Sequence, residues 1–381
     1  MLKKILTKGN KLITFAAIIT VILGSLMVVS AEMGNSVGDA DYLALVSKKQ
    51  AEYALFGILI YFIVLAIPFY RLRTAIYWIG YLVILGALLS CRLFGQINGA
   101  YAWITIGSTA TIQPSEFAKV FMIAFAAKLL ATDHGEKNLT YFWRYGFAAF
   151  VYFVIIVIYQ HDFGSGVVLF VICYCMMLIP MHKQLRTVQF WMLVLIVAGL
   201  IGMGIMMSKP FTEFLKAHAD NYMVARFLAA ADPFLYQYDN GYHLIMSLVS
   251  FANGGISGLG YGNSIHKYMN FPNPSNDFIL PVIVEETGIL GFGAFLLLYG
   301  CMLLPIVRAS IRSKRLSSKI VLLGVFTYFI AHFILNIGGV SGLIPLTGVP
   351  LLMVSSGGSS LVASLCALAL AQSEIERSAG K

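Results

Sequence analysis

The chain has 381 residues, of which 59% are hydrophobic and only 11% are charged. A soluble domain carries about 25% charged residues, so this composition excludes a soluble globular protein and indicates an all-α polytopic membrane protein. The formal net charge is +9, and the positions of the basic residues relative to the membrane decide whether that charge points to nucleic acid.

Apolar stretches of about 20 residues recur along the whole chain, and each is long enough to cross a bilayer as a helix. The first follows four lysines and is too long for the apolar core of a typical signal peptide, so we interpret it as a transmembrane helix. The ten predicted spans are residues 12–31, 53–70, 74–91, 115–131, 144–160, 163–181, 188–207, 279–306, 319–337 and 348–371.

The loops between these spans predict the orientation, because Lys and Arg collect on the cytoplasmic side of a membrane. With the N-terminus in the cytoplasm, most of the 26 basic residues fall on the inner side and most of the 17 acidic residues fall on the outer side. Both termini are then cytoplasmic. The positive charge is explained by topology, so no nucleic-acid partner is expected.

One long outer loop, residues 208–278, separates the seventh span from the eighth. It contains two helix-compatible segments, 211–219 and 222–231, and a glycine-rich run, 253–262. A loop of this length in a compact protein is usually functional or disordered, and its many apolar and aromatic residues argue against disorder. We expect a single integral membrane domain over residues 1–381, with no soluble domain and no repeat.

The segment NPSNDFILPVIVEETGIL, residues 273–290, places three carboxylates at or inside an apolar helix. Asp277 lies where the outer loop meets the eighth span, and Glu285 and Glu286 follow about two helical turns later. Carboxylates near hydrocarbon are costly and therefore mark candidate functional sites. Asp277 is also well placed to cap the following helix, and the residues alone leave both interpretations open.

A second polar group lies around the start of the fourth span. Trp103 suits a membrane–water interface, and Pro114 with Ser115 marks a helix start at which an acidic residue is favoured. Glu116 and Lys119 are three residues apart and therefore share a helix face. They form either an ion pair that locks the helix end or part of a substrate-facing surface.

Asp162 lies in the short turn before the sixth span and is followed by Phe163-Gly-Ser-Gly166. It either caps that span or belongs to a site that the glycines allow backbone to approach closely. The Gly-x-Gly pattern is too short, and in the wrong context, for a nucleotide-binding fingerprint.

The C-terminal part is rich in helix breakers, with Ile337-Gly-Gly-Val-Ser-Gly-Leu-Ile-Pro-Leu-Thr-Gly348, Pro350 and Ser355-Ser-Gly-Gly-Ser-Ser360. Broken backbone at membrane depth occurs only where protein or water satisfies it, which predicts a re-entrant segment or cavity wall. The serines could donate hydrogen bonds to a phosphate or serve close helix packing.

In chain order these stretches resemble the SEDS family (shape, elongation, division and sporulation), whose members include FtsW, RodA and SpoVE. The resemblance covers about residues 12–372. It is carried by Trp103-Ile-Thr-Ile-Gly107, Gln113-Pro-Ser-Glu116 with Lys119, Asp162-Phe-Gly-Ser165, Gly241-Tyr-His with Ser247, Gly254-Gly255 to Gly262, Asp277-Phe-Ile with Glu285-Glu286-x-Gly288, Gly342-Leu-Ile-Pro-Leu-Thr-Gly348 and Gly357-Gly-Ser-Ser360.

The tail from Pro345 looks more like FtsW of Gram-positive bacteria than like RodA. The chain departs from the family at Ala102, where Arg is common and a phosphate clamp is thereby put in doubt. Two further departures, Ser275-Asn276 for His-Thr and Ser355-Ser356 for Ser-Tyr, leave Asp277 in place.

The resemblance implies a peptidoglycan glycosyltransferase that polymerises lipid II at the outer face of the bacterial cytoplasmic membrane, in cell division or cell-shape control. Asp277 matches the catalytic aspartate and would be the general base. Substrate-binding or supporting roles would fall to Trp103, Gln113, Ser115, Glu116, Lys119, Asp162, Glu285, Glu286, Ser359 and Ser360.

The leaving pyrophosphate needs positive charge, which implies a divalent cation, Mg²⁺ or Mn²⁺, or a basic residue. The candidate metal ligands are Asp277, Asp162 and Glu116, and the candidate basic residues are Lys119, Arg226 and Lys267, with Lys119 preferred. No organic cofactor is expected. Expected partners are lipid II, the growing undecaprenyl-linked glycan, a class B penicillin-binding protein, divisome or elongasome proteins, and membrane lipids.

Two other functions are compatible with an intramembrane set of carboxylates and broken helices. A lipid II flippase or other transporter would use polar groups near the midplane and internal repeats. Here the charged residues cluster at one face and no repeat is evident. A non-catalytic scaffold for a transpeptidase would lack the aspartate, and Asp277 is present.

Overall fold

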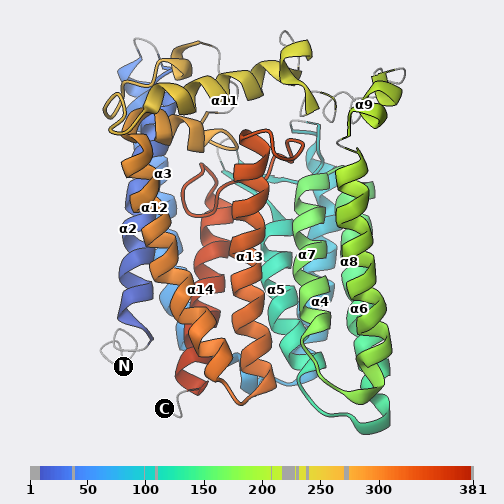
Figure 1. Cartoon of the computed structure of the whole chain (residues 1–381). Coiled ribbons are helices and arrows are strands. Elements are labelled where there is room, and N and C mark those ends of the chain that lie inside the picture. Colours follow the sequence, from blue (N-terminus) through green and yellow to red (C-terminus); the bar gives the residue numbers. More distant parts are fainter. Residues whose placement is uncertain are drawn as a thin grey trace.

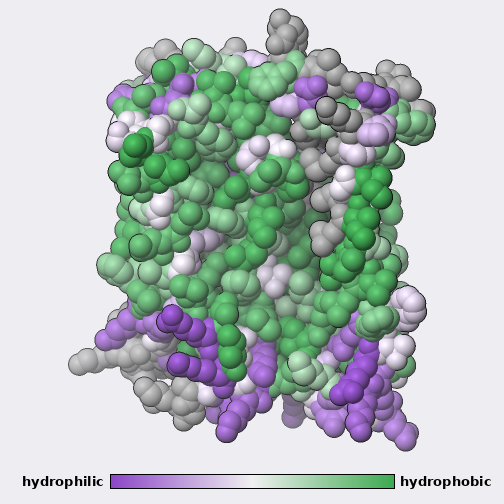
Figure 2. All heavy atoms as spheres, in the orientation of Figure 1, coloured by the Kyte–Doolittle hydropathy of each residue, from purple (hydrophilic) through white to green (hydrophobic). Residues whose placement is uncertain are grey.

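Apolar helices run side by side between two polar ends in the computed structural model (Figure 1). The structure describes residues 9–36, 39–97, 99–107, 110–206, 208–216, 228, 231–236, 240–269 and 274–378. Figure 2 shows hydrophobic residues over the middle of the visible face and hydrophilic residues gathered toward its two ends. Helices suit such an environment because hydrocarbon offers backbone groups no hydrogen-bond partners.

Each predicted span overlaps one long helix. The helices are α2 (Lys11–Glu32), α3 (Ala40–Ala66), α4 (Thr74–Ser90), α5 (Pro114–Leu130), α6 (Asn138–Val154), α7 (Phe163–Leu178), α8 (Arg186–Met206), α12 (Ile279–Arg312), α13 (Leu316–Val340) and α14 (Gly358–Ser378). Among the described residues, eight helical stretches are long and apolar enough to cross a membrane, whereas α5 and α7 are shorter. The chain is thus a polytopic membrane protein.

The last predicted span begins too early. Residues 348–357 form no helix in the structure, and α14 starts only at Gly358. Pro350 and Gly357 interrupt the apolar run, and the backbone around them bonds to side chains of other segments, as described below. This non-helical stretch is the broken C-terminal backbone that the glycines and prolines predicted.

The start of α2 and the end of α14 lie at one end of the bundle, here called the termini end (Figure 1). The opposite end, the loop end, holds residues 240–269 and 274–278 and the starts of α5, α7, α12 and α14. Two helices of the outer loop occur there, α9 (Lys209–Lys216) and α11 (Asn240–Gly254). The segment expected to be helical at 211–219 overlaps α9, while that at 222–231 falls almost entirely outside the described residues.

A short antiparallel hairpin leads into α5. Strand β1 (Ile104–Ile106) pairs with β2 (Ala110–Ile112), with Ile104 opposite Ile112. The chain then turns directly into the helix, whose first residue is Pro114. The hairpin therefore delivers Gln113 to the loop end of the bundle.

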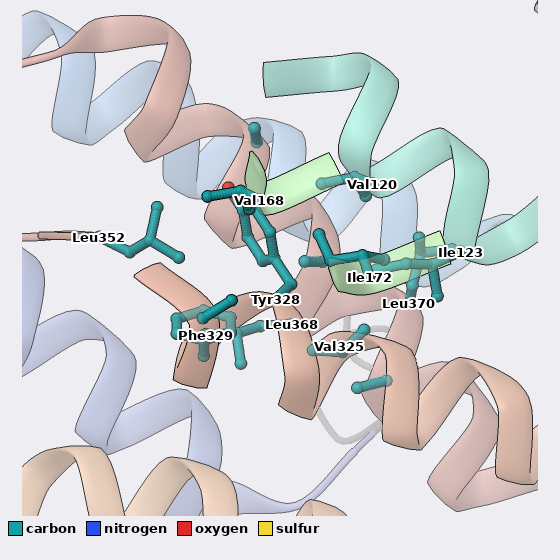
Figure 3. Close-up of a cluster of buried hydrophobic side chains, with 14 of the residues drawn as sticks. Val120, Ile123, Val168, Ile172, Val325, Tyr328, Phe329, Leu352, Leu368 and Leu370 are labelled. Atoms are coloured by element: carbon teal, nitrogen blue, oxygen red, sulfur yellow. The ribbon is translucent and has the colours of Figure 1, made fainter. Parts of the chain in front are cut away.

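The centre of the bundle is a packed apolar core between α5, α7, α13 and α14 (Figure 3). Ten of its members, each less than 8% exposed, are Val120, Ile123, Val168, Ile172, Val325, Tyr328, Phe329, Leu352, Leu368 and Leu370. Close packing of this kind, rather than the exclusion of water, holds helices together in lipid. Helix α13 thus has neighbours on several sides.

Helix α12 is broken near its start. Gly288 has φ 66° and ψ −170°, which no helical residue adopts. The glycine-rich run fills the break: Leu259 N and Gly260 N donate to the carbonyls of Glu285 and Glu286, both at 2.9 Å. A Cβ on Gly258 would lie 2.2 Å from the Glu286 carbonyl oxygen, so only glycine fits there. The glycine-rich run therefore packs into the break of α12.

Candidate active site

Asp277 lies half-buried at the loop end, two residues before α12 begins. The N-cap position belongs to Phe278, whose side chain cannot accept a cap hydrogen bond. Three consecutive carbonyls of the segment are anchored instead: Ser275 O accepts from Ser356 N at 2.7 Å, Asn276 O from Ser355 Oγ at 2.8 Å, and Asp277 O from Asn336 Nδ2 at 2.9 Å. The backbone that carries this carboxylate is thus held by α13 and by the stretch before α14.

The turn at residues 345–350 faces Asp277. A Cβ on Gly348, whose φ is 68°, would lie 3.6 Å from Asp277 Oδ2. On its other side the turn meets α7, because a Cβ on Gly164 would lie 2.3 Å from the Thr347 carbonyl oxygen. Close backbone approach therefore brings Asp277, this turn and the start of α7 together.

Asp162 caps α7 and also binds a neighbouring segment. Its Oδ1 accepts from Ser165 N at 3.0 Å, and its Oδ2 accepts from Gln113 Nε2 at 2.9 Å. The backbone N–H of Gln113 donates to Ser359 Oγ at 3.0 Å. Three of the predicted site residues, Gln113, Asp162 and Ser359, are therefore joined by hydrogen bonds, and the capping interpretation of Asp162 is confirmed.

Glu116 and Lys119 form a buried ion pair, with 2.6 Å between Glu116 Oε1 and Lys119 Nζ and 1% exposure for each side chain. The Lys119 ammonium also contacts His332 Nε2 at 3.3 Å, and Tyr328 OH donates to Glu116 Oε2 at 3.4 Å. This geometry matches the ion-pair interpretation, and neither charge is presented to a surface.

Glu285 and Glu286 lie in a second buried cluster, the loop cluster, formed with residues 264–267 and α2. Glu285 Oε1 is 2.7 Å from His266 Nδ1, and its Oε2 accepts from Ser264 Oγ at 2.5 Å. Glu286 Oε1 is 2.7 Å from Lys267 Nζ and accepts from Ser30 Oγ at 2.6 Å. Both carboxylates are at most 1% exposed, so they support α12 and the loop rather than face a groove.

The other predicted residues are distributed differently. Trp103 is half-buried beside the hairpin, and Ser115 is fully buried in the first turn of α5. Ser360 is 6% exposed, and its hydroxyl donates to the Gly357 carbonyl at 3.0 Å. Lys267 forms an ion pair with Glu286, and Arg226 lies outside the described residues.

The residues present do not fit a protein-held metal. Over the part of the chain that the structure describes, no group of three or more His, Cys, Asp or Glu side chains could hold a metal ion. Of the three candidate ligands, Glu116 is bound to Lys119 and Asp162 to Gln113 and Ser165. The bond between Asp162 and Gln113 joins residues 49 positions apart, so the sequence alone does not reveal it. We derive no catalytic step through a metal held by these carboxylates.

Sequence reasoning missed the residues that anchor Asp277. Asn336 and His332 are polar residues within the apolar run of α13, which was a usable signal because such residues are costly in lipid. Ser355 and Ser356 belong to a motif whose sequence indicates a phosphate donor or a packing surface. Their true partners, the carbonyls of residues 275 and 276, are visible only in three dimensions.

The fold and these contacts define a polytopic membrane protein that holds a carboxylate on a fixed backbone at one end of its helical bundle. The family model FTSW_RODA_SPOVE, described as "Cell cycle protein", matches residues 10–378. The chain therefore belongs to the FtsW/RodA/SpoVE family, which confirms the resemblance seen in the sequence.

Curated relatives and solved structures agree with this assignment. Stage V sporulation protein E of Bacillus subtilis (strain 168) is 31% identical over 372 residues, covering 95% of each chain. The "Probable peptidoglycan glycosyltransferase FtsW" of the same organism is 32% identical over 373 residues, covering 95% of this chain and 89% of the relative.

Two solved structures share the fold. A chain from a structure titled "Structural coordination of polymerization and crosslinking by a peptidoglycan synthase complex" aligns with TM-score 0.71 and 21% identity, covering 98% of this chain and 99% of that one. Rod shape determining protein RodA of Thermus thermophilus aligns with TM-score 0.62 and 20% identity, covering 97% of both.

Proposed function

We propose that this chain is a peptidoglycan glycosyltransferase that polymerises lipid II into glycan strands, with Asp277 as its general base. The relatives named as probable peptidoglycan glycosyltransferases, at about 30% identity over most of the chain, support the activity. The observation that carries the role of Asp277 is its half-buried carboxylate at the loop end on a backbone anchored through three successive carbonyls.

The chemistry needs one proton acceptor at the acceptor sugar. Asp277 removes the proton from the 4-hydroxyl of the GlcNAc of lipid II, and that oxygen forms a bond to the anomeric carbon of the growing chain. The bond from this carbon to the pyrophosphate breaks, and undecaprenyl pyrophosphate leaves with the electron pair. A positioned base typically contributes about 100- to 10,000-fold to the rate.

The orientation belongs to the same proposal. We place the loop end outside the cytoplasmic membrane and both termini inside, with ten spans. Basic residues at the ends of the helices near the termini end, such as Arg312 and Arg377, support this orientation. Lipid II presents its sugars outside while its tail stays in the bilayer, so a base at the loop end meets the sugar.

Charge compensation for the pyrophosphate is a separate element of the proposal. Lys119 and Lys267 are both buried in ion pairs, and neither presents its ammonium to a surface. We therefore expect Mg²⁺ or Mn²⁺ to arrive with the pyrophosphate. Chelation by EDTA should lower the polymerisation rate at least tenfold, and added Mg²⁺ or Mn²⁺ should restore it; a rate insensitive to EDTA would assign the charge to a basic side chain.

The partner is proposed to be a class B penicillin-binding protein, in division or cell-shape control. A neighbour in fold comes from a structure whose title names a peptidoglycan synthase complex. We expect polymerisation to require the cognate transpeptidase, and the assay below therefore includes it.

The test is lipid II polymerisation by the purified protein, with its cognate transpeptidase and a divalent cation. Asp277→Asn keeps the shape of the side chain and removes the base. Its control is Asp41→Asn, an identical change at an exposed aspartate in the first turn of α3, at the loop end. We expect strands from the wild type and from Asp41→Asn, and none from Asp277→Asn with unchanged folding.

Two results would overturn the proposal in different ways. Equal polymerisation by Asp277→Asn and wild type would remove Asp277 as the base and leave the activity. No polymerisation by any form with the partner present would remove the activity, and movement of lipid II across vesicle membranes would then be measured to test the flippase alternative.

A further inference from the structure

Three polar side chains line one face of the mostly apolar helix α13. Tyr328, His332 and Asn336 are four residues apart, so they lie one above another along the helix. Their exposed fractions are 0%, 0% and 3%. Buried polar groups in a membrane helix are costly unless they find partners, and each of these three is hydrogen-bonded to residues outside α13.

Asn336 joins two backbone segments through a single amide nitrogen. Its Nδ2 donates to the carbonyl of Asp277 at 2.9 Å and to the carbonyl of Val349 at 2.9 Å. An amide NH₂ has two hydrogens, so both bonds can form at once. Val349 is adjacent to Gly348, which faces the Asp277 carboxylate. Asn336 therefore fixes the separation between Asp277 and the turn opposite it.

His332 holds the same turn one residue further on. Its Nδ1 lies 3.1 Å from the carbonyl of Pro350, and its Nε2 lies 3.3 Å from the ammonium of Lys119. A carbonyl can only accept and an ammonium can only donate, so His332 carries its proton on Nδ1 and accepts at Nε2. The tautomer is thus dictated by its two partners.

The series continues into the membrane interior. Lys119 is paired with Glu116, and Glu116 accepts a hydrogen bond from Tyr328, one helical turn before His332. Tyr328 belongs to the apolar core (Figure 3). The buried ion pair of α5 is therefore connected through α13 to the turn at 348–350 and, through Asn336, to the segment that carries Asp277.

We propose that Asn336 and His332 are positioning residues for Asp277: together they hold residues 277 and 348–350 in register, so that the carboxylate stays at the place where the acceptor hydroxyl binds. This inference rests on the proposed glycosyltransferase function. In this proposal neither Asn336 nor His332 touches the substrate. A displacement of about 1 Å at a reacting group can cost about 100-fold in rate, which is why such an anchor matters.

The experiment removes the two donors of Asn336 and compares the result with a matched amide. Asn336→Leu keeps the approximate size and abolishes both bonds. The control is Gln189→Met, because Gln189 Nε2 also donates to two carbonyls, those of Met177 at 3.0 Å and Pro180 at 2.6 Å, where α7 leads into α8. Asn336→Gln keeps an amide on a longer stem and serves if the leucine variant does not fold.

Two readouts are measured for each variant, kcat and KM for lipid II and hydrogen exchange of peptides covering residues 274–278 and 346–350. We expect Asn336→Leu to lower kcat about 10- to 100-fold, to change KM less than about threefold, and to speed exchange of both peptides. Asn336→Gln should retain more activity than Asn336→Leu, and Gln189→Met should behave as wild type. The acid limb of the pH–rate profile should not move, because Asn336 binds the carbonyl and not the carboxylate.

The outcomes separate this proposal from the proposed function. Wild-type kcat in Asn336→Leu, or in an Asn336→Gln variant whose two peptides exchange faster, while Asp277→Asn is inactive, would overturn the positioning role and leave the glycosyltransferase intact. An equal loss in Gln189→Met would reduce the effect to general packing and also overturn it. If the wild type makes no glycan, both the function and this role fall. A loss of kcat confined to Asn336, with faster exchange in both peptides, supports it.

Discussion

Asp162 and Asp277 both precede a helix at the loop end, yet the structure uses them differently. The carboxylate of Asp162 caps α7 and binds Gln113, so both of its oxygens are engaged within the protein. Asp277 stands one residue before the N-cap of α12 and is held through its backbone carbonyl. The backbone of Asp277 is thus fixed by a neighbouring helix, whereas Asp162 is held through its carboxylate.

The largest expected effect is the difference between these two aspartates in catalysis. Asp277→Asn should lower kcat/KM by about 100- to 10,000-fold because it removes the base. Asp162→Asn should lower it less than about tenfold, since an amide oxygen still accepts from Ser165 N. Steady-state polymerisation rates of the two variants test this prediction. A larger loss of kcat/KM in Asp162→Asn than in Asp277→Asn would contradict the role of Asp277 as the base.

The next effect concerns the loop cluster that supports α12 after Asp277. Glu286→Gln leaves the fully buried Lys267 ammonium without its counter-charge, which should destabilise the fold by about 3–5 kcal/mol. Unfolding in detergent measures this, with Glu136→Gln, an exposed residue at the termini end, as the control. Equal stabilities of the two variants would show that the pair does not hold α12.

A smaller loss of stability should follow from adding a Cβ where the glycine-rich run contacts α12. A Cβ on Gly254 would lie 2.1 Å from the Val284 carbonyl oxygen, whereas a Cβ on Gly255, at φ 50°, meets nothing within 4 Å. We expect Gly254→Ala to cost about 3 kcal/mol by overpacking and Gly255→Ala about 1 kcal/mol by backbone strain. Unfolding curves of the pair test this order, and the reverse order would contradict the contact.

The smallest effect is the cap itself. Asp162→Ala should destabilise the protein by about 1 kcal/mol, the usual cost of losing an N-cap side chain, and Asp162→Asn by less. Thermal unfolding of both variants provides the comparison. If Asp162→Ala were as stable as wild type, the hydrogen bond to Ser165 N would contribute nothing to the free energy of unfolding, and Asp162 would not act as a stabilising cap.

The fold class, the positions of the helices and the family could be predicted from the sequence alone. The apolar stretches, each near the thickness of a bilayer, identify a membrane bundle and place a helix at every predicted span, because hydrocarbon permits few alternatives. The ordered motifs identify the family. The spacing of Glu116 and Lys119 placed them on one helix face, with an ion pair as one of two interpretations, and the structure shows that pair.

Only the tertiary structure decided which hydrogen-bond or ion-pair partner each polar residue has. Asp162 caps α7, whereas the N-cap of α12 is Phe278. The three metal candidates form no metal-binding group over the part of the chain that the structure describes. Glu286 bonds to Ser30, which is 256 positions away in the chain. Asn336 came to anchor Asp277 although 59 residues separate them. Local rules give the helices and their faces, but a hydrogen-bond partner on another helix depends on how the whole bundle packs.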